Sequence, residues 1–475
     1  MGAVTQPCAG PPQAGLRPLG GQERNDVGAA MNAPATGPPA GGERVYPPQS
    51  HDIAPALAWY TQTRAVYSGG NEVELLRGGD TLFPAMCEAI AAAMHEVWLA
   101  TYFFDDDPAA RCVVAELVAA AARGVRVRVV VDGFGSQRAL APLRELLEPH
   151  GVSLAVFRPL HGWWSWLQPG QFRRLHQKLC VVDGQIGFVG GINLIDDRRD
   201  LRHGESEHPR LDYAVRLIGP VVVPIEHTVR AVWTRVAFGR DWRDEVRQIA
   251  RSGQPVLRAR RLLRRMRIAL RRRTPAQGRP RRLAPVRAAF VVRDNVRQRR
   301  SIERSYIEAL RGARERIDLV CPYFYPGRDF RHALTAAARR GVRVRLLLQG
   351  KADYRFAALA AQALYDEMLA HGMHIYEYLP AFLHAKVALV DDDWATVGSS
   401  NIDPLSLLVN LEANVLVNDR DFVARLASEL ERDFAESREI TAPAALPGWR
   451  RWMRRGVVAW AAALYLRLAG AAGRY

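Results

Sequence analysis

The stretch His384-Ala385-Lys386-Val387-Ala388-Leu389-Val390-Asp391 repeats the spacing of His176-Gln177-Lys178-Leu179-Cys180-Val181-Val182-Asp183. Both segments read H-x-K-x-x-x-x-D, and their tails, Gly190-Gly191-Ile192-Asn193 and Gly398-Ser399-Ser400-Asn401, also correspond. The four apolar residues between lysine and aspartate predict a buried strand, with His and Lys on one face at its start. A single His-Lys pair cannot both attack and protonate a substrate. The two copies therefore predict two half-sites that face one substrate.

A second repeat supports this duplication. Residues 121–133 and 338–350 are identical at eight of thirteen positions. Each copy is typical of an alanine-rich helix that ends at a glycine, Gly124 or Gly341. The strand that follows begins with alternating Arg and Val and ends in three apolar residues. This pattern indicates that the later part of the strand is buried on both faces. With a further apolar strand opening each half, the order predicts two similar α/β domains packed around one central cleft.

Composition restricts the binding partners. The chain has 475 residues, and 66 Lys+Arg against 49 Asp+Glu give a net charge of +17 and a pI near 10.2. Such a chain should seek polyanions, either nucleic acid or anionic lipid, and charge alone does not choose between them. The five cysteines form no C-x-x-C pair, so neither a zinc site nor a disulfide framework is expected. Cys180 is expected to be a buried core thiol.

Several segments lie outside the repeat. Residues 1–50 are rich in Pro, Gly and Ala and are expected to be a disordered tail without a secretory signal, with Met1 or Met31 as the start. Residues 251–285 form an arginine-rich linker with thirteen arginines and no acid up to residue 282. An apolar stripe within it favours a helix that lies on an anionic membrane surface, and the alternative is a solvated linker.

Two tryptophan-rich segments are further candidates for membrane contact. Residues 447–475 contain Trp449 and Trp452 among arginines, followed by a ten-residue apolar run at 457–466 that is too short to span a bilayer. This segment fits an amphipathic interfacial helix, and the alternative is a terminal helix packed on the core. The Trp163-Trp164-Ser165-Trp166 loop either is buried or forms a hydrophobic rim at the cleft. No run of 18 apolar residues occurs, so no spanning helix is expected.

The paired motifs resemble the HKD signature of the phospholipase D superfamily. More narrowly, the chain resembles the bacterial cardiolipin synthases of the B type over roughly residues 70 to 450. The second motif and its continuation carry this likeness, in residues 383–392, 394–406 and 410–415. The resemblance implies two phospholipase D-like domains with a mixed sheet flanked by helices. We expect the first at 60–245 and the second at 286–440.

The residue types suit attack on a phosphodiester. A neutral imidazole avoids the repulsion that an anionic nucleophile would meet, and a phosphohistidine would form. Lys178 and Lys386 would supply positive charge to the non-bridging oxygens, and Asn193, Asn401 and Ser399 would donate hydrogen bonds to them. Lysine and amide donors would replace a metal, so no cofactor and no metal are expected. The residues alone do not distinguish which of the two histidines is the nucleophile.

The resemblance adds roles for individual residues. It implies that His176 is the nucleophile and His384 the general acid and base. An acidic residue some thirty positions beyond each histidine would orient it, and the matching positions are Asp212 and Glu412. Asp183 and Asp391 complete the motifs, and their place after a buried strand indicates structural anchoring by ion pairs. The tail departs from the common family pattern at Gly191, where serine is usual, although the B-type synthases commonly have glycine.

The combined interpretation is a cardiolipin synthase, an enzyme that joins two phosphatidylglycerol molecules and releases glycerol. It would bind peripherally to the anionic cell membrane, on the cytoplasmic face. One alternative is a phospholipase D that hydrolyses lipid or exchanges other headgroups. A nucleic-acid phosphodiesterase is another, favoured by the charge. Such a phosphodiesterase would not need the apolar tail, and minimal nucleases of the superfamily carry one motif per chain. No nucleic-acid partner is therefore expected.

Overall fold

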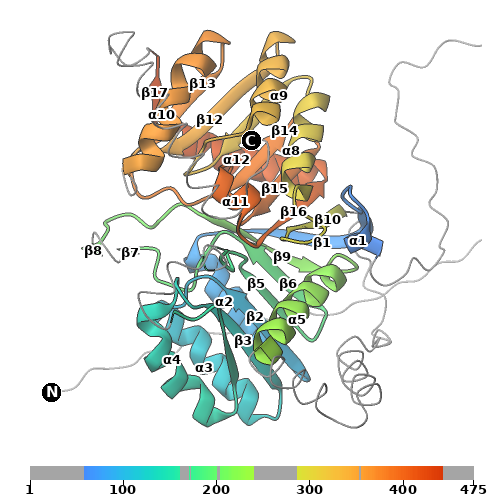
Figure 1. Ribbon diagram of the computed structural model, residues 1–475, viewed down its shortest axis with the longest axis vertical. Coiled ribbons are helices and arrows are strands. Elements are labelled where there is room, and N and C mark those ends of the chain that lie inside the picture. The colour runs from blue at the N-terminus through green and yellow to red at the C-terminus, as the bar shows by residue number, and fades with distance from the viewer. Residues whose placement is uncertain are drawn as a thin grey trace, which may run out of the picture. The chain divides into compact units, whose positions relative to one another are not determined.

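The computed structural model describes residues 58–160, 171, 173–200, 204–239, 286–351 and 355–441. Within them, fifteen strands form one sheet in the order β17-β13-β12-β11-β14-β15-β16-β10-β1-β9-β6-β5-β2-β3-β4 (Figure 1). The strands of the first half are β1 (Ser68–Arg77), β2 (Glu96–Thr101), β3 (Arg126–Asp132), β4 (Ser153–Phe157), β5 (Leu179–Val182), β6 (Ile186–Gly190) and β9 (Tyr213–Ile218). Those of the second are β10 (Val286–Arg293), β11 (Arg316–Val320), β12 (Arg343–Gln349), β13 (His374–Tyr378), β14 (Val387–Val390), β15 (Trp394–Gly398), β16 (Glu412–Asn418) and β17 (Ser437–Ile440).

The two halves repeat one topology. The order β4-β3-β2-β5-β6-β9-β1 in the first half matches β13-β12-β11-β14-β15-β16-β10 in the second. In each half the first three strands are parallel and the motif strand runs antiparallel to them. The halves meet where β1 pairs antiparallel with β10, with Ser68 opposite Ala288. The predicted pair of α/β halves with a mixed sheet is confirmed.

Helices cover the sheet of each half on both faces. The first half carries α1 (Ala58–Thr61), α2 (Gly79–Ala91), α3 (Pro108–Ala122), α4 (Leu140–Leu147) and α5 (Val222–Gly239), with two short 3-10 turns (Gln137–Ala139 and Glu148–His150) and a small hairpin of β7 (Arg199–Asp200) and β8 (Gly204–Glu205). The second half carries α8 (Ser301–Gly312), α9 (Arg328–Arg339), α10 (Arg355–Ala370), α11 (Pro404–Leu408) and α12 (Arg420–Ala435). Alternation along β2 shows the two faces, because Leu99 packs with α2 and α3 whereas Trp98 packs with α5.

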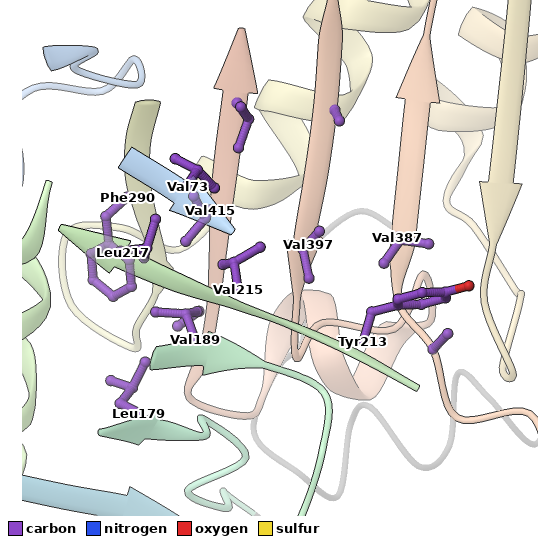
Figure 2. Close-up of a cluster of buried hydrophobic side chains, with 14 of the residues drawn as sticks. Val73, Leu179, Val189, Tyr213, Val215, Leu217, Phe290, Val387, Val397 and Val415 are labelled. Atoms are coloured by element: carbon purple, nitrogen blue, oxygen red, sulfur yellow. The ribbon is translucent and has the colours of Figure 1, made fainter. Parts of the chain in front are cut away.

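The central core joins the halves. Figure 2 shows Val215 and Leu217 of β9 and Val189 of β6 beside Val397 of β15 and Val415 of β16, and all five belong to one buried cluster. Residues of the first half thus pack directly on residues of the second. Because burial of apolar surface is the main stabilising contribution, neither half would keep this face dry alone.

The local signals of the sequence agree with the structure. Gly124 and Gly341 both have φ +87° and follow the ends of α3 and α9, as the predicted helix stops require. The motif strands β5 and β14 are buried at every position, and Cys180 is 1% exposed.

The predicted tail at 1–50, the arginine-rich linker, the tryptophan loop and residues 447–475 lie outside the described residues. Among the described helices, none has the length and apolar character needed to cross a membrane.

Candidate active site

Two short parallel bridges bring the motifs together. Leu175, just before His176, pairs with Leu411 of the second half, and Leu383, just before His384, pairs with Leu211 of the first half. The amide of His176 donates to the carbonyl of Leu411 at 3.0 Å, and that of His384 donates to the carbonyl of Leu211 at 2.8 Å. Each histidine is therefore attached to the backbone that precedes the acid of the opposite half.

The acids exchange partners between the halves. His176 Nδ1 lies 3.0 Å from Glu412 Oε2, and His384 Nδ1 lies 2.6 Å from Asp212 Oδ2. The position of Asp212 and Glu412 some thirty residues beyond each histidine suggests pairs within a half, and this expectation is wrong because the acids pair across the halves. Because an ionised carboxylate can only accept hydrogen bonds, each of these contacts requires the proton of the neutral imidazole to lie on Nδ1. Nε2 of each ring is then left with its lone pair.

The motif lysines are buried beside the histidines. Lys178 Nζ donates to the carbonyl of His176 at 2.8 Å, and Lys386 Nζ donates in the same way to that of His384. Loss of hydration is the main cause that lowers the pKa of Lys178 to about 7 and that of Lys386 to about 8. The charge of Lys386 also lowers the pKa of Lys178, while Glu412 opposes the shift of Lys178 and Asp212 opposes that of Lys386. Burial also raises the pKa of Asp212 to about 7. A phosphodiester anion placed here would favour the charged form of both lysines.

Burial also acts on the histidines. Desolvation lowers the pKa of His176, and the Glu412 carboxylate opposes that shift. The pKa of His384 falls well below its usual value, through desolvation and then through Lys386 and Lys178. Both rings are therefore neutral near pH 7 in the empty site, which is the state that a nucleophile needs.

Ser399 does not point where the sequence predicted. Its Oγ donates to Glu412 Oε2 at 2.5 Å and accepts from the amide of Ala413 at 3.1 Å. The hydroxyl proton is thus directed at the carboxylate that holds His176, rather than at a phosphate. In the first half the matching residue is Gly191, where a Cβ would lie 2.3 Å from Asp212 Oδ1. Gly191 therefore makes the room that Asp212 occupies.

The motif asparagines and aspartates lie in different places. Asn401 is buried and its Oδ1 has a weak contact with Cys321 Sγ at 4.0 Å, whereas Asn193 Oδ1 is buried without a partner among the described residues. Asp183 and Asp391 follow the far ends of β5 and β14, away from the histidines. Each has a left-handed backbone, φ +52° and φ +55°.

These two aspartates have the predicted anchoring role, but they bind backbone amides and not the basic side chains of the expected ion pairs. Asp183 accepts from the amides of Met94, His95 and Glu96, all at 2.8 Å. Asp391 accepts from the equivalent amides of Arg314, Glu315 and Arg316 at 2.8–3.2 Å. Three amide donors satisfy each carboxylate and fix the start of the neighbouring strand.

Two further residues that hold backbone amides were not among the predicted site residues. Asp132 Oδ2 accepts from the amide of Leu175 at 2.8 Å, and Gln349 Oε1 accepts from that of Leu383 at 3.1 Å. Both residues end the repeated strand, at positions 132 and 349, and their correspondence in the repeat was the available signal. Tyr102 was also missed, although its ring packs 5.0 Å from that of His176.

The described part of the chain contains no group of three His, Cys, Asp or Glu side chains placed to hold a metal ion. The polar groups that the structure brings together are two imidazoles, two lysine amino groups and two carboxylates.

Known proteins are similar to this chain over both halves. A family described as cardiolipin synthase, PLD-like domain, matches residues 86–203 and 306–434. The chain is similar to cardiolipin synthase B of Escherichia coli K12, with 37% identity over 361 residues, which is 76% of this chain and 80% of that protein. It is 30% identical over 398 residues to cardiolipin synthase A of Pseudomonas putida GB-1, covering 83% of this chain and 75% of that protein.

A solved structure supports the fold. The phosphatidylserine synthase of Haemophilus influenzae superposes with a TM-score of 0.55 at 13% identity, over 82% of this chain and 93% of that one. The family matches fall on both halves, and the identity to curated relatives extends over most of the chain. The chain belongs to the cardiolipin synthase family of proteins with phospholipase D-like domains.

Proposed function

We propose that this protein is a cardiolipin synthase that transfers the phosphatidyl group of one phosphatidylglycerol to a second and releases glycerol. The observation that carries the proposal is the exchange of acids, His176 with Glu412 and His384 with Asp212. One chain then holds two imidazoles with fixed tautomers, which is the minimum that a double displacement needs. The relatives named cardiolipin synthase support lipid as the substrate class.

In the first step, Nε2 of His176 attacks phosphorus and forms a P–N bond. The P–O bond to the glycerol headgroup breaks, and His384 gives its Nε2 proton to the departing oxygen. Phosphate bound beside His384 favours the protonated ring, which offsets the depressed pKa of that imidazole in the empty site. The product of this step is a phosphatidyl-histidine and free glycerol.

In the second step, a hydroxyl of another phosphatidylglycerol gives its proton to His384 and attacks phosphorus. The P–N bond to His176 breaks, and that ring is again neutral with its proton on Nδ1. Lys178, Lys386, Asn193 and Asn401 stabilise the non-bridging oxygens in both steps. Ser399 supports Glu412 and so acts through His176.

The site would work at a lipid surface. We assign a peripheral location on the cytoplasmic face of the cell membrane, with the arginine-rich linker 251–285 attracted to anionic headgroups. The segment 447–475 would add apolar insertion. Truncation after Pro447 should move the protein from vesicle pellet to supernatant at high salt, because salt screens only the arginines. If the truncated protein still sediments with the vesicles, the membrane anchor lies in another segment of the chain.

The test of the activity is a product assay by mass spectrometry. The protein is incubated with phosphatidylglycerol vesicles or, separately, with single-stranded DNA. Cardiolipin and glycerol in equal amounts are expected. Phosphatidic acid as the sole lipid product would identify a phospholipase that uses water as the acceptor, and cleaved DNA would identify a nuclease. His176→Ala and His384→Ala supply the inactive controls.

A further inference from the structure

Two cysteines outside the active site contact each other. Cys87 on α2 and Cys112 on α3 have their Sγ atoms 3.5 Å apart. Cys112 is exposed and Cys87 is half-buried, so the pair is open to solvent on one side. A disulfide has an S–S length of about 2.05 Å, so closure requires the sulfurs to approach by about 1.5 Å. We propose that Cys87 and Cys112 form a thiol modification site that closes to an intramolecular disulfide when a small disulfide oxidant is present.

The two thiols have different surroundings, and we therefore expect them to react in different steps. Burial, together with the contact with Cys112 and the charge of Glu116, raises the pKa of the Cys87 thiol to about 12. Cys87 is therefore the poorer nucleophile while Cys112 is reduced. Cys112 lies at the surface, where its Sγ–H donates to the carbonyl of Ala109 at 3.0 Å. Cys112 is the thiol that a dissolved oxidant meets first.

The chemistry then balances in two exchanges. The Cys112 thiolate attacks one sulfur of oxidised glutathione, forms a mixed disulfide and releases one glutathione thiol. The Cys87 thiolate attacks Cys112 Sγ and releases the second. Two protein thiols lose two electrons and two protons, and one glutathione disulfide becomes two thiols. The bond connects neighbouring helices of the first half, both packed on the same face of the sheet.

The other thiols of the described chain provide internal controls. Cys180 and Cys321 are each about 1% exposed, and burial raises the pKa of both thiols to about 12. They should remain reduced under conditions that oxidise the surface pair. The selectivity of the reaction is therefore part of the proposal.

Peptide mapping of the full chain tests it. The protein is incubated with oxidised glutathione, free thiols are blocked, and the product is digested with trypsin without reductant. Cleavage at Arg77, Arg111 and Arg123 puts Cys87 in peptide 78–111 and Cys112 in peptide 112–123. We expect these two peptides to appear linked, two mass units below their sum, and to separate on reduction.

Two serine variants test the order of events. Cys87→Ser should stop at the mixed disulfide and keep glutathione on Cys112, whereas Cys112→Ser should acquire no adduct and no link. Oxidation should raise the urea midpoint of unfolding of the natural chain and leave that of Cys112→Ser unchanged, since the bond restricts the unfolded chain. Glutathione retained on Cys112 in the natural chain, or a link from either cysteine to Cys8 or to a second molecule, would overturn the proposal.

Discussion

Ser399 Oγ donates a hydrogen bond of 2.5 Å to Glu412 Oε2, and the position that corresponds to Ser399 in the first half is Gly191. The carboxylate behind His176 therefore has a hydroxyl support that the one behind His384 lacks. The two half-sites of one chain are built from the same motif but are not equivalent.

Ser399→Ala should lower kcat about tenfold, because a hydrogen bond to a charged group contributes roughly 1.5–3 kcal/mol and His176 still holds Glu412. KM should change little, since Ser399 does not face the phosphate. Ser305→Ala is the control, because Ser305 is also buried and its hydroxyl donates to the carbonyl of Ser301 within α8. Steady-state kinetics on phosphatidylglycerol in mixed micelles gives both constants.

Gly191→Ser should be far more damaging than Ser399→Ala. A Cβ at this position meets Asp212 Oδ1 at 2.3 Å, so the carboxylate that holds His384 must move. We expect a loss of about 100-fold or more in kcat/KM with the fold intact by circular dichroism. Gly312→Ser is the control, because a Cβ there meets no atom within 4 Å. Near-normal activity in Gly191→Ser would show that the Asp212 contact is dispensable.

The exchange of acids can be read from the covalent intermediate. Asp212→Asn disturbs His384. With a donor whose leaving group departs without protonation, an adduct on His176 still forms, but its capture by an alcohol slows, so the phosphatidyl adduct should accumulate. Glu412→Gln disturbs His176, so little adduct should form. A radioactive phosphatidyl donor with such a leaving group labels the adduct in both variants, and the reaction is quenched in denaturant at alkaline pH because acid hydrolyses the P–N bond. Pairing within each half would produce the opposite result, with adduct in Glu412→Gln only.

Lys178 should lower the free energy of unfolding of the protein when no phosphodiester is bound. Its pKa is about 7 when folded and near its usual 10.5 when unfolded. Between these values the unfolded chain binds a proton that the folded chain does not, so the free energy of unfolding rises with pH in this window. Urea unfolding at pH 7 and pH 9 should show this rise, and Lys178→Met should reduce it and raise the midpoint at pH 7. Lys351→Met, at a lysine outside the site, should leave the pH dependence unchanged.

The same titration should limit activity. As pH rises from about 7 through about 8, Lys178 and Lys386 lose the charge that attracts the phosphodiester. We therefore expect kcat/KM to fall on the alkaline side, whereas kcat falls at higher pH because bound phosphate retains the protons. A flat profile of kcat/KM from pH 7 to pH 9 would contradict the assigned role of the lysines.

Activity should persist after exhaustive chelation, because Lys178 and Lys386 supply the positive charge at the phosphate. The assay uses soluble short-chain substrate with excess EDTA, which removes the separate effect of divalent cations on anionic vesicles. Loss of turnover, restored by one specific divalent ion, would disprove this prediction.

Periodicity and repeats predicted the motif strands and the helix stops at Gly124 and Gly341, because these depend on local backbone and burial. The partners of the histidines could not be predicted in the same way. Asp212 and Glu412 each follow a histidine in the chain, whereas their exchange depends on the long-range bridges Leu175–Leu411 and Leu211–Leu383. The direction of the Ser399 hydroxyl likewise depends on where β16 places Glu412, which residue spacing does not encode.

Both half-sites lie within one continuous polypeptide, and its two halves meet where β1 pairs antiparallel with β10. In a symmetric homodimer every residue at one half-site must recur at the other, so a substitution that improves a nucleophile also alters the acid. Covalent fusion removes that constraint. Gly191 and Ser399, and Asp212 and Glu412, are differences that only a fused pair can hold, and they allow one imidazole to specialise for attack while the other specialises for proton transfer.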